Sequence, residues 1–118
     1  MELTFENIVE YTISEFPQLV SEYKSEYEQA NAEDGMNIYM FFGPIVREHF
    51  IKLVVCSKGK DENTLWELKR LAEFFEKIAK SKEWNMRTLL SIGVFEGIDD
   101  SILEIAKPFL GPECKKLL

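Results

Sequence analysis

The sequence predicts an all-α domain of five or six helices packed as antiparallel pairs, a helical bundle for which HEAT-like stacking is a variant. Apolar residues recur at steps of three and four along most of the chain, which is the period of one helix face. The connections between these periodic segments are short, which favours antiparallel neighbours. Because 118 residues is close to the commonest size of one domain, we expect a single helical domain over residues 1–118.

The first two expected helices cover residues 4–16 and 17–31. Thr4 is placed to cap the first helix, and Pro17 cannot continue that helix but is well suited to begin the next one. A polar loop without periodicity follows at residues 31–35. The expected core positions are Phe5, Ile8, Val9, Thr12, Ile13 and Phe16 in the first helix, and Leu19, Val20, Tyr23, Tyr27 and Ala30 in the second.

Residues 36–57 form the most apolar segment, and a helix that is apolar nearly all round is usually central. Gly43-Pro44 interrupts it, and we expect a kink or a short break there because proline removes a backbone donor and clashes with the preceding turn. A strand at 51–56 is the alternative, since that stretch is rich in β-branched residues, but no second strand is available to pair with it. We expect the part from Met36 to Val55 to be the most buried.

The longest helical pattern lies at residues 64–80, and a second helix follows at about 83–96. Ser81 is placed to cap the second helix and Gly97 to end it, while Asp99 is placed to cap a short helix that Pro108 closes. Gly111-Pro112 begins a last turn. The expected core positions are Leu65, Leu68, Leu71, Ala72, Phe75, Ile78 and Ala79, widened by Trp66 and Phe74, and then Met86, Leu89, Leu90, Val94 and Trp84.

Charge and cysteine content exclude several function classes. The formal net charge of −7 repels nucleic-acid phosphate and anionic lipid, so we expect no nucleic-acid partner and no membrane partner. The acidic N-terminus is unlike a signal peptide, and no apolar run approaches the roughly 18 residues of a membrane span. Cys56 and Cys114 form no C-x-x-C pair, which favours reduced thiols. We therefore expect a cytoplasmic protein.

No motif indicates catalysis, a metal site or a cofactor. His49 is the only histidine and has no H-E-x-x-H pattern around it, so we interpret it as structural. Glu96, Asp99 and Asp100 lack the spacing of a calcium loop, and a helix end followed by an N-cap explains them. We expect a non-catalytic protein with no metal and no cofactor. The alternative is an enzymatic or small-ligand-binding helical domain that uses an apolar pocket near Phe41–His49.

Negative charge is concentrated at the start of the chain. Residues 1–35 contain nine acidic residues and one basic residue, a net of −8, whereas residues 36–118 contain twelve acidic and thirteen basic residues, a net of +1. The acids either keep the protein soluble or form a docking face for a basic partner. Tyrosines lie among them and are common interface anchors, although they could equally belong to the core. The candidate protein-binding residues are Glu6, Glu10, Glu22, Glu26, Tyr11 and Tyr27.

Four segments carry a family resemblance: F-F-G-P-I-V-R at 41–47, L-A-E-F-F-E-K-I-A-K-S at 71–81, N-M-R-T-L-L-S-I-G-V-F-E-G-I at 85–98 and F-L-G-P-E-C-K at 109–115. Together they resemble a bacterial family of small all-helical domains of unknown function, some of whose members are thought to be immunity proteins of polymorphic toxin systems. The similar part covers about two-thirds of the chain. The resemblance implies a protein-binding domain, in its most specific form an immunity-type inhibitor whose partner is a basic toxin. The matching positions are packing positions, so they imply no catalytic residues.

Overall fold

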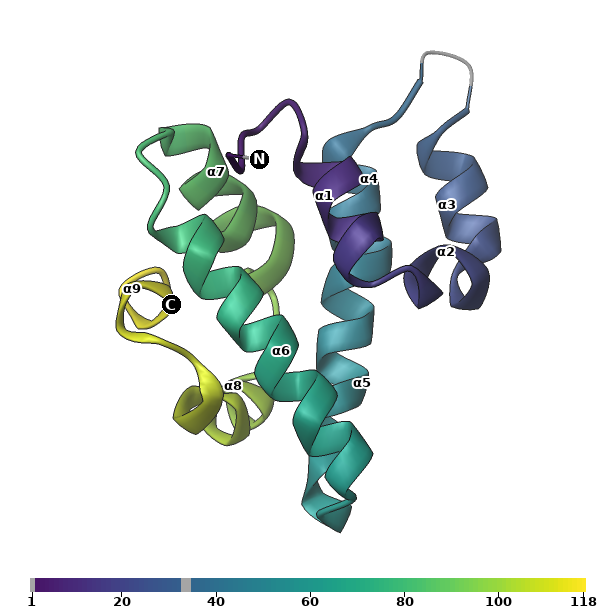
Figure 1. Ribbon diagram of the computed structural model, residues 1–118. Helices are drawn as coiled ribbons and strands as arrows, with labels where there is room; N and C mark the ends of the chain where they lie inside the picture. The colour runs from purple at the N-terminus through teal and green to yellow at the C-terminus, as the bar shows by residue number, and fades with distance from the viewer. Residues whose placement is uncertain (1, 33–34) are drawn as a thin grey trace.

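The computed structural model describes residues 2–32 and 35–118, and helices joined by short connections make up most of this part of the chain (Figure 1). No strand occurs within it, so the all-α prediction is confirmed. The elements are α1 (Ile8–Glu15), α2 (Gln18–Glu22), α3 (Lys24–Ala30), α4 (Ile38–Phe41), η1 (Phe42–Arg47), α5 (Glu48–Cys56), η2 (Ser57–Gly59), α6 (Glu62–Ala79), α7 (Trp84–Thr88), η3 (Leu89–Phe95), α8 (Asp100–Ala106), η4 (Lys107–Phe109) and α9 (Pro112–Lys115). The alternative strand at 51–56 is wrong, because those residues lie in α5.

The helical segments are more numerous than the five or six expected, and they are not all arranged as antiparallel pairs. The helices α5 and α6, joined through η2, pack together and run in opposite directions (Figure 1). Around them lie shorter segments: α8 packs on α5, α9 packs on α6, and α3 packs on α4. No helix in the described residues is long and apolar enough to cross a membrane.

The first expected helix begins later than the sequence predicts, and the second is divided into α2 and α3. The helix α1 begins at Ile8, because residues 5–7 form a separate turn that Thr4 closes: the Asn7 N–H donates to the Thr4 hydroxyl at 3.2 Å. The second expected helix is divided at Tyr23, whose φ of −121° and ψ of 42° are not helical. This change of direction lets α2 contact α6 while α3 packs along α4. The loop expected at 31–35 includes residues 33 and 34, which lie outside the described residues.

The central helix is continuous from α4 through η1 to α5. The kink or break expected at Gly43-Pro44 takes the form of a wider π-helical turn, η1. A wide turn of this kind accommodates a proline, which lacks the N–H that a regular turn needs. A second π-helical turn, η3, packs directly against η1. The two backbones approach closely, since a Cβ added to Gly43 would lie 3.9 Å from the carbonyl oxygen of Gly93.

Aromatic side chains of the central helix and α6 form much of the core. Phe50 and Phe75 are fully buried and pack edge to face with ring centroids 5.2 Å apart. Within the segment expected to be the most buried, Tyr39, Met40 and Val55 are exposed instead. The two tryptophans expected to widen apolar faces are also exposed, by 63% for Trp66 and 71% for Trp84. The helical period gives the direction of each ring around its own helix axis, but it does not show whether another helix covers that position.

Helix ends confirm the sequence prediction at some positions and correct it at others. Gly97 ends η3 with a positive φ of 82°, and Asp99 caps α8 by accepting the Ser101 N–H at 2.9 Å. The helix α6 begins two residues earlier than expected, because the Asp61 carboxylate caps it. Ser81 does not cap α7, which begins at residue 84; its hydroxyl accepts an N–H within the preceding turn.

Glu76 ties the C-terminal segment to α6. Its carboxylate accepts the N–H groups of Glu113 at 3.2 Å and Cys114 at 3.0 Å, which are the first unpaired donors of α9. Burial, followed by the nearby Glu76 carboxylate, raises the pKa of the fully buried Cys114 thiol to about 12. Cys56 is exposed, and both cysteines are free thiols.

Candidate functional site

Four carboxylates from four different helices lie near enough to Tyr23 for their charges to act on its hydroxyl, and two of them, Glu22 and Glu67, also lie within 4 Å of His49. Burial has the largest effect in raising the pKa of Tyr23, and the negative charges of these four carboxylates raise it further. Among residues 2–32 and 35–118, no lysine or arginine forms an ion pair with any of the four. This acidic patch consists of Glu22 at the end of α2, Glu26 in α3, Glu48 at the start of α5 and Glu67 in α6.

His49 forms the buried base of the acidic patch and is only 2% exposed. Its Nε2 lies 3.1 Å from Oε1 of Glu67, and its Nδ1 lies 3.1 Å from the Tyr23 hydroxyl oxygen and 3.8 Å from Oε2 of Glu22. In the neutral ring, Nε2–H donates to Glu67 and Nδ1 accepts from the Tyr23 hydroxyl, so both nitrogens are satisfied. Gln18 also donates to Glu67. These contacts support the interpretation of His49 as a structural histidine that joins three helices.

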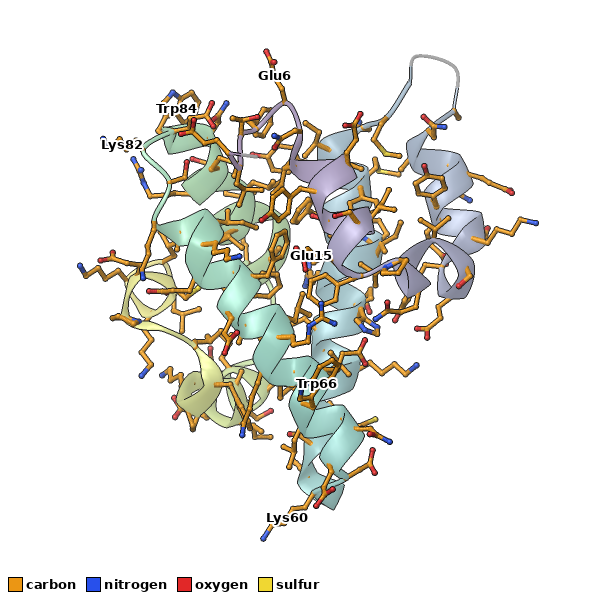
Figure 2. The ribbon with its side chains drawn as sticks, viewed as in Figure 1. Glu6, Glu15, Lys60, Trp66, Lys82 and Trp84 are labelled. Atoms are coloured by element: carbon orange, nitrogen blue, oxygen red, sulfur yellow. The ribbon has the colours of Figure 1, made fainter. Side chains whose placement is uncertain are left out.

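The predicted binding acids fall into two separate groups. Glu22 and Glu26 belong to the acidic patch, where Glu22 is exposed and Glu26 is half-buried. Glu6 and Glu10 are exposed, with Glu6 just before α1 and Glu10 in its first turn, whereas Glu22 and Glu26 follow the far end of α1 in the chain. Figure 2 shows Glu6 at the opposite end of α1 from Glu15. The structure therefore does not combine all four acids into one face.

The two predicted tyrosines are both half-buried against the core. The Tyr11 ring stacks on Phe74 with centroids 5.9 Å apart, and the Tyr27 ring packs edge to face on Phe41 at 6.3 Å. Each tyrosine thus contributes to packing and leaves only part of its ring at the surface. Both roles that the sequence left open, core packing and partner contact, are therefore compatible with these positions, and the binding role of Tyr11 and Tyr27 stays a prediction.

Sequence reasoning missed Glu48 and Glu67 as members of the patch. Both were counted among the evenly balanced charges of residues 36–118. Glu67 is one of several glutamates along α6, and no local pattern distinguishes it from the others. A helix period shows which residues share a face of one helix, but it does not show which helices meet.

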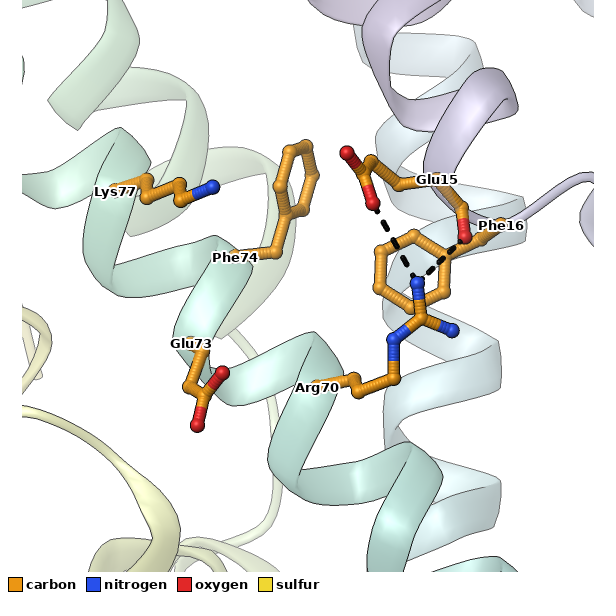
Figure 3. Close-up of a pocket in the computed structure, with 6 residues that line it drawn as sticks. All are labelled: Glu15, Phe16, Arg70, Glu73, Phe74 and Lys77. Atoms are coloured by element: carbon orange, nitrogen blue, oxygen red, sulfur yellow. Dashed lines mark hydrogen bonds and ion pairs between the residues drawn. The ribbon is translucent and has the colours of Figure 1, made fainter.

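Arg70 joins α6 to the end of α1 (Figure 3). Its Nη2 donates to the Glu15 carbonyl oxygen at 3.0 Å and lies 3.5 Å from the Glu15 carboxylate. The guanidinium carbon lies 4.9 Å from the ring centroid of Phe16 and 5.0 Å from that of Trp66. A cavity of about 100 Å³ adjoins these side chains, and it is smaller than a typical ligand pocket. The cavity is lined by Glu15, Phe16, Arg70, Glu73, Phe74 and Lys77.

The segment Phe41–His49, which the alternative interpretation treats as a pocket, packs into the core. Phe41 and Phe42 are fully buried and contact each other edge to face at 5.7 Å, and Ile45 and Val46 are fully buried as well. In the described part of the chain, no group of three or more histidine, cysteine, aspartate or glutamate side chains is placed to hold a metal ion.

The fold and the patch define an all-α domain with a concentrated acidic surface on four of its helices. The chain belongs to the family described as Domain of unknown function (DUF7674), whose model matches residues 9–118. This range contains the whole acidic patch and Trp66. No curated protein and no solved structure matches the chain. Membership in a family of unknown function is thereby confirmed, while a bacterial origin and an immunity role stay predictions.

Proposed function

We propose that the protein is a non-catalytic protein-binding domain that acts in the cytoplasm and docks a basic partner on its acidic patch. In its most specific form, the partner is a toxin and the domain is an immunity-type inhibitor. The observation that supports this proposal is the convergence of Glu22, Glu26, Glu48 and Glu67 near Tyr23, where none of them forms an ion pair with a lysine or arginine of the described residues. Carboxylates that are held close together repel one another, and a basic surface brought against them relieves that repulsion.

The patch acts in this proposal mainly on the rate of encounter. Its carboxylates are only partly buried, so they project a negative potential into solvent over a distance of about 8–10 Å at ordinary ionic strength. Complementary potentials of this kind raise association rates and make them sensitive to salt. Once the partner is bound, the buried contacts between His49, Tyr23 and Glu67 keep the helices that carry the patch in place.

Two other interpretations have less support. Acidic residues that serve only solubility can be spread over the surface, whereas the four glutamates of the acidic patch belong to different helices and lie together near Tyr23. The small-ligand or enzymatic alternative requires an opening near Phe41–His49, but that segment is occupied by packed aromatic and aliphatic side chains. His49 has both ring nitrogens engaged by Tyr23 and Glu67, which leaves no free nitrogen for proton transfer to a substrate.

Charge reversal at the patch tests the proposal. The wild-type protein and Glu22→Lys/Glu26→Lys are used to capture proteins from native lysate, and any captured basic protein is purified. Its association rate with each variant is then measured against ionic strength. Glu96→Lys/Glu104→Lys is the matched control, since it makes the same change in net charge at two exposed positions, one just after η3 and one in α8.

The patch reversal should slow association by about tenfold at low salt and flatten the salt dependence. The control should keep a rate close to that of the wild type and a similar salt slope. If the patch reversal and the control associate at equal rates with equal salt slopes, the acids serve solubility alone. The same conclusion follows if none of the captured proteins is basic.

A further inference from the structure

Trp66 exposes 63% of its surface, although its indole is one of the largest apolar groups that a protein can bury. Exposed tryptophans that lie beside other site features are frequent hot spots of protein interfaces. Trp84 is the natural comparison, because it is 71% exposed but lies at the start of α7. In Figure 2, Trp84 lies near the top of the view and Trp66 in its lower half, so the two side chains are well apart.

Arg70 orders the Trp66 ring before any partner arrives. The guanidinium lies between the Trp66 ring, at 5.0 Å, and the Phe16 ring, at 4.9 Å. Its position is fixed by the 3.0 Å hydrogen bond to the Glu15 carbonyl oxygen, which Figure 3 shows. An aromatic side chain that is already ordered loses less conformational entropy on binding, and its contacts therefore contribute more to affinity.

Trp66 also adjoins the acidic patch. It directly precedes Glu67 in α6, and both Glu67 and Arg70 contact the corner between α1 and α2. Glu67 contacts Gln18 at the start of α2, while Arg70 contacts Glu15 at the end of α1. A cation that reaches this corner therefore meets an exposed indole together with the Glu67 carboxylate, which forms no ion pair with a lysine or arginine of the described residues. Tryptophan is the aromatic residue that attracts cations most strongly.

We infer that Trp66 anchors the docking of a basic protein, with an arginine or lysine side chain of that partner lying across the exposed part of the indole ring. This inference rests on the proposed function, and it adds that Trp66 is the residue that the basic partner contacts most closely. A second copy of the chain is a poorer occupant, because it would bring its own acidic patch to the same surface and the two patches would repel each other.

A hexa-arginine peptide serves as the probe, and a hexa-glutamate peptide is its control. Titrations in a Trp84→Phe background make the tryptophan fluorescence report on Trp66 alone. Calorimetry then compares the affinities of wild type, Trp66→Ala, Trp66→Phe, Trp84→Ala and Glu22→Lys/Glu26→Lys for hexa-arginine. Thermal unfolding of each variant verifies that the fold is retained.

Hexa-arginine should change the Trp66 emission, and hexa-glutamate should not. Trp66→Ala should weaken hexa-arginine binding by about tenfold, as the loss of a strong cation–π contact requires. Trp66→Phe should lose less, and Trp84→Ala should bind like the wild type.

If Trp66→Ala and Trp84→Ala bind hexa-arginine equally well while the patch reversal weakens binding, the Trp66 inference is wrong and the proposed function stands. If neither Trp66→Ala nor the patch reversal weakens binding, both are wrong. Self-association in sedimentation experiments that Trp66→Ala abolishes would identify a second copy as the occupant and would also overturn the inference.

Discussion

Replacing Gly111 by alanine tests how the C-terminal helix α9 is held to α6. Gly111 has a φ of −74° and a ψ of 172°, a conformation that alanine adopts without strain. The added Cβ, however, would lie 2.5 Å from Oε1 and 2.8 Å from Cγ of Glu76, closer than such atoms approach in proteins. The Glu76 side chain must therefore move away.

The cost follows from the bonds that Glu76 then loses. Its carboxylate accepts the N–H groups of Glu113 and Cys114, and hydrogen bonds to a charged group contribute about 1.5–3 kcal/mol each. Loss of a helix N-cap costs about 0.5–2 kcal/mol. Glu76 is only half-buried, so water replaces part of what is lost. We expect Gly111→Ala to lower the free energy of unfolding by about 2 kcal/mol, or the melting temperature by roughly 8 °C.

A double-mutant cycle isolates this contact. Glu76→Ala alone should cost about as much as Gly111→Ala. In the Glu76→Ala background, Gly111→Ala should be neutral or slightly stabilising, because the three atoms nearest to the new Cβ all belong to Glu76 and alanine restricts the unfolded chain. Urea unfolding of the four proteins measures the coupling. If the cost of the double variant equals the sum of the two single-variant costs to within about 0.5 kcal/mol, the reasoning is refuted.

The remaining predictions concern the two cysteines and His49. At pH 8, a thiol reagent should modify the exposed Cys56 in the folded protein, whereas Cys114 should react only after unfolding; rapid native-state labelling of a Cys56→Ser variant would contradict this. Because the Cys114 thiol has a pKa of about 12 when folded and about 9.0 when unfolded, its contribution to stability should be complete below pH 9 and decline as the pH rises towards 12. His49→Ala should lower the free energy of unfolding by about 2–4 kcal/mol, since it leaves a cavity and removes partners from buried polar groups. It should leave binding of a basic partner nearly unchanged, and loss of binding at an unchanged melting temperature would place His49 in the site itself.

The sequence by itself determined the helical class and several helix ends, because these depend on neighbouring residues. Apolar residues at steps of three and four predict a helix whatever that helix packs against in the folded protein. The positive φ at Gly97 and the cap at Asp99 follow from the chemistry of those residues. The same local reasoning located the disturbance at Gly43-Pro44. It could not show that the helix continues there through a π-helical turn, since that turn packs against η3 from a distant part of the chain.

Only the tertiary structure decided the composition of the candidate site. Glu22 and Glu67 are 45 positions apart in the sequence, and they meet at His49 because α2 packs where α5 and α6 come together. The exposure of Trp66 was decided in the same way, since the pattern placed it beside an apolar face but could not show that 63% of its surface stays uncovered. Helical periodicity sets the direction of a side chain around its own axis. Which faces meet depends on non-local apolar contacts among several helices, and these contacts leave no periodic signal in the sequence.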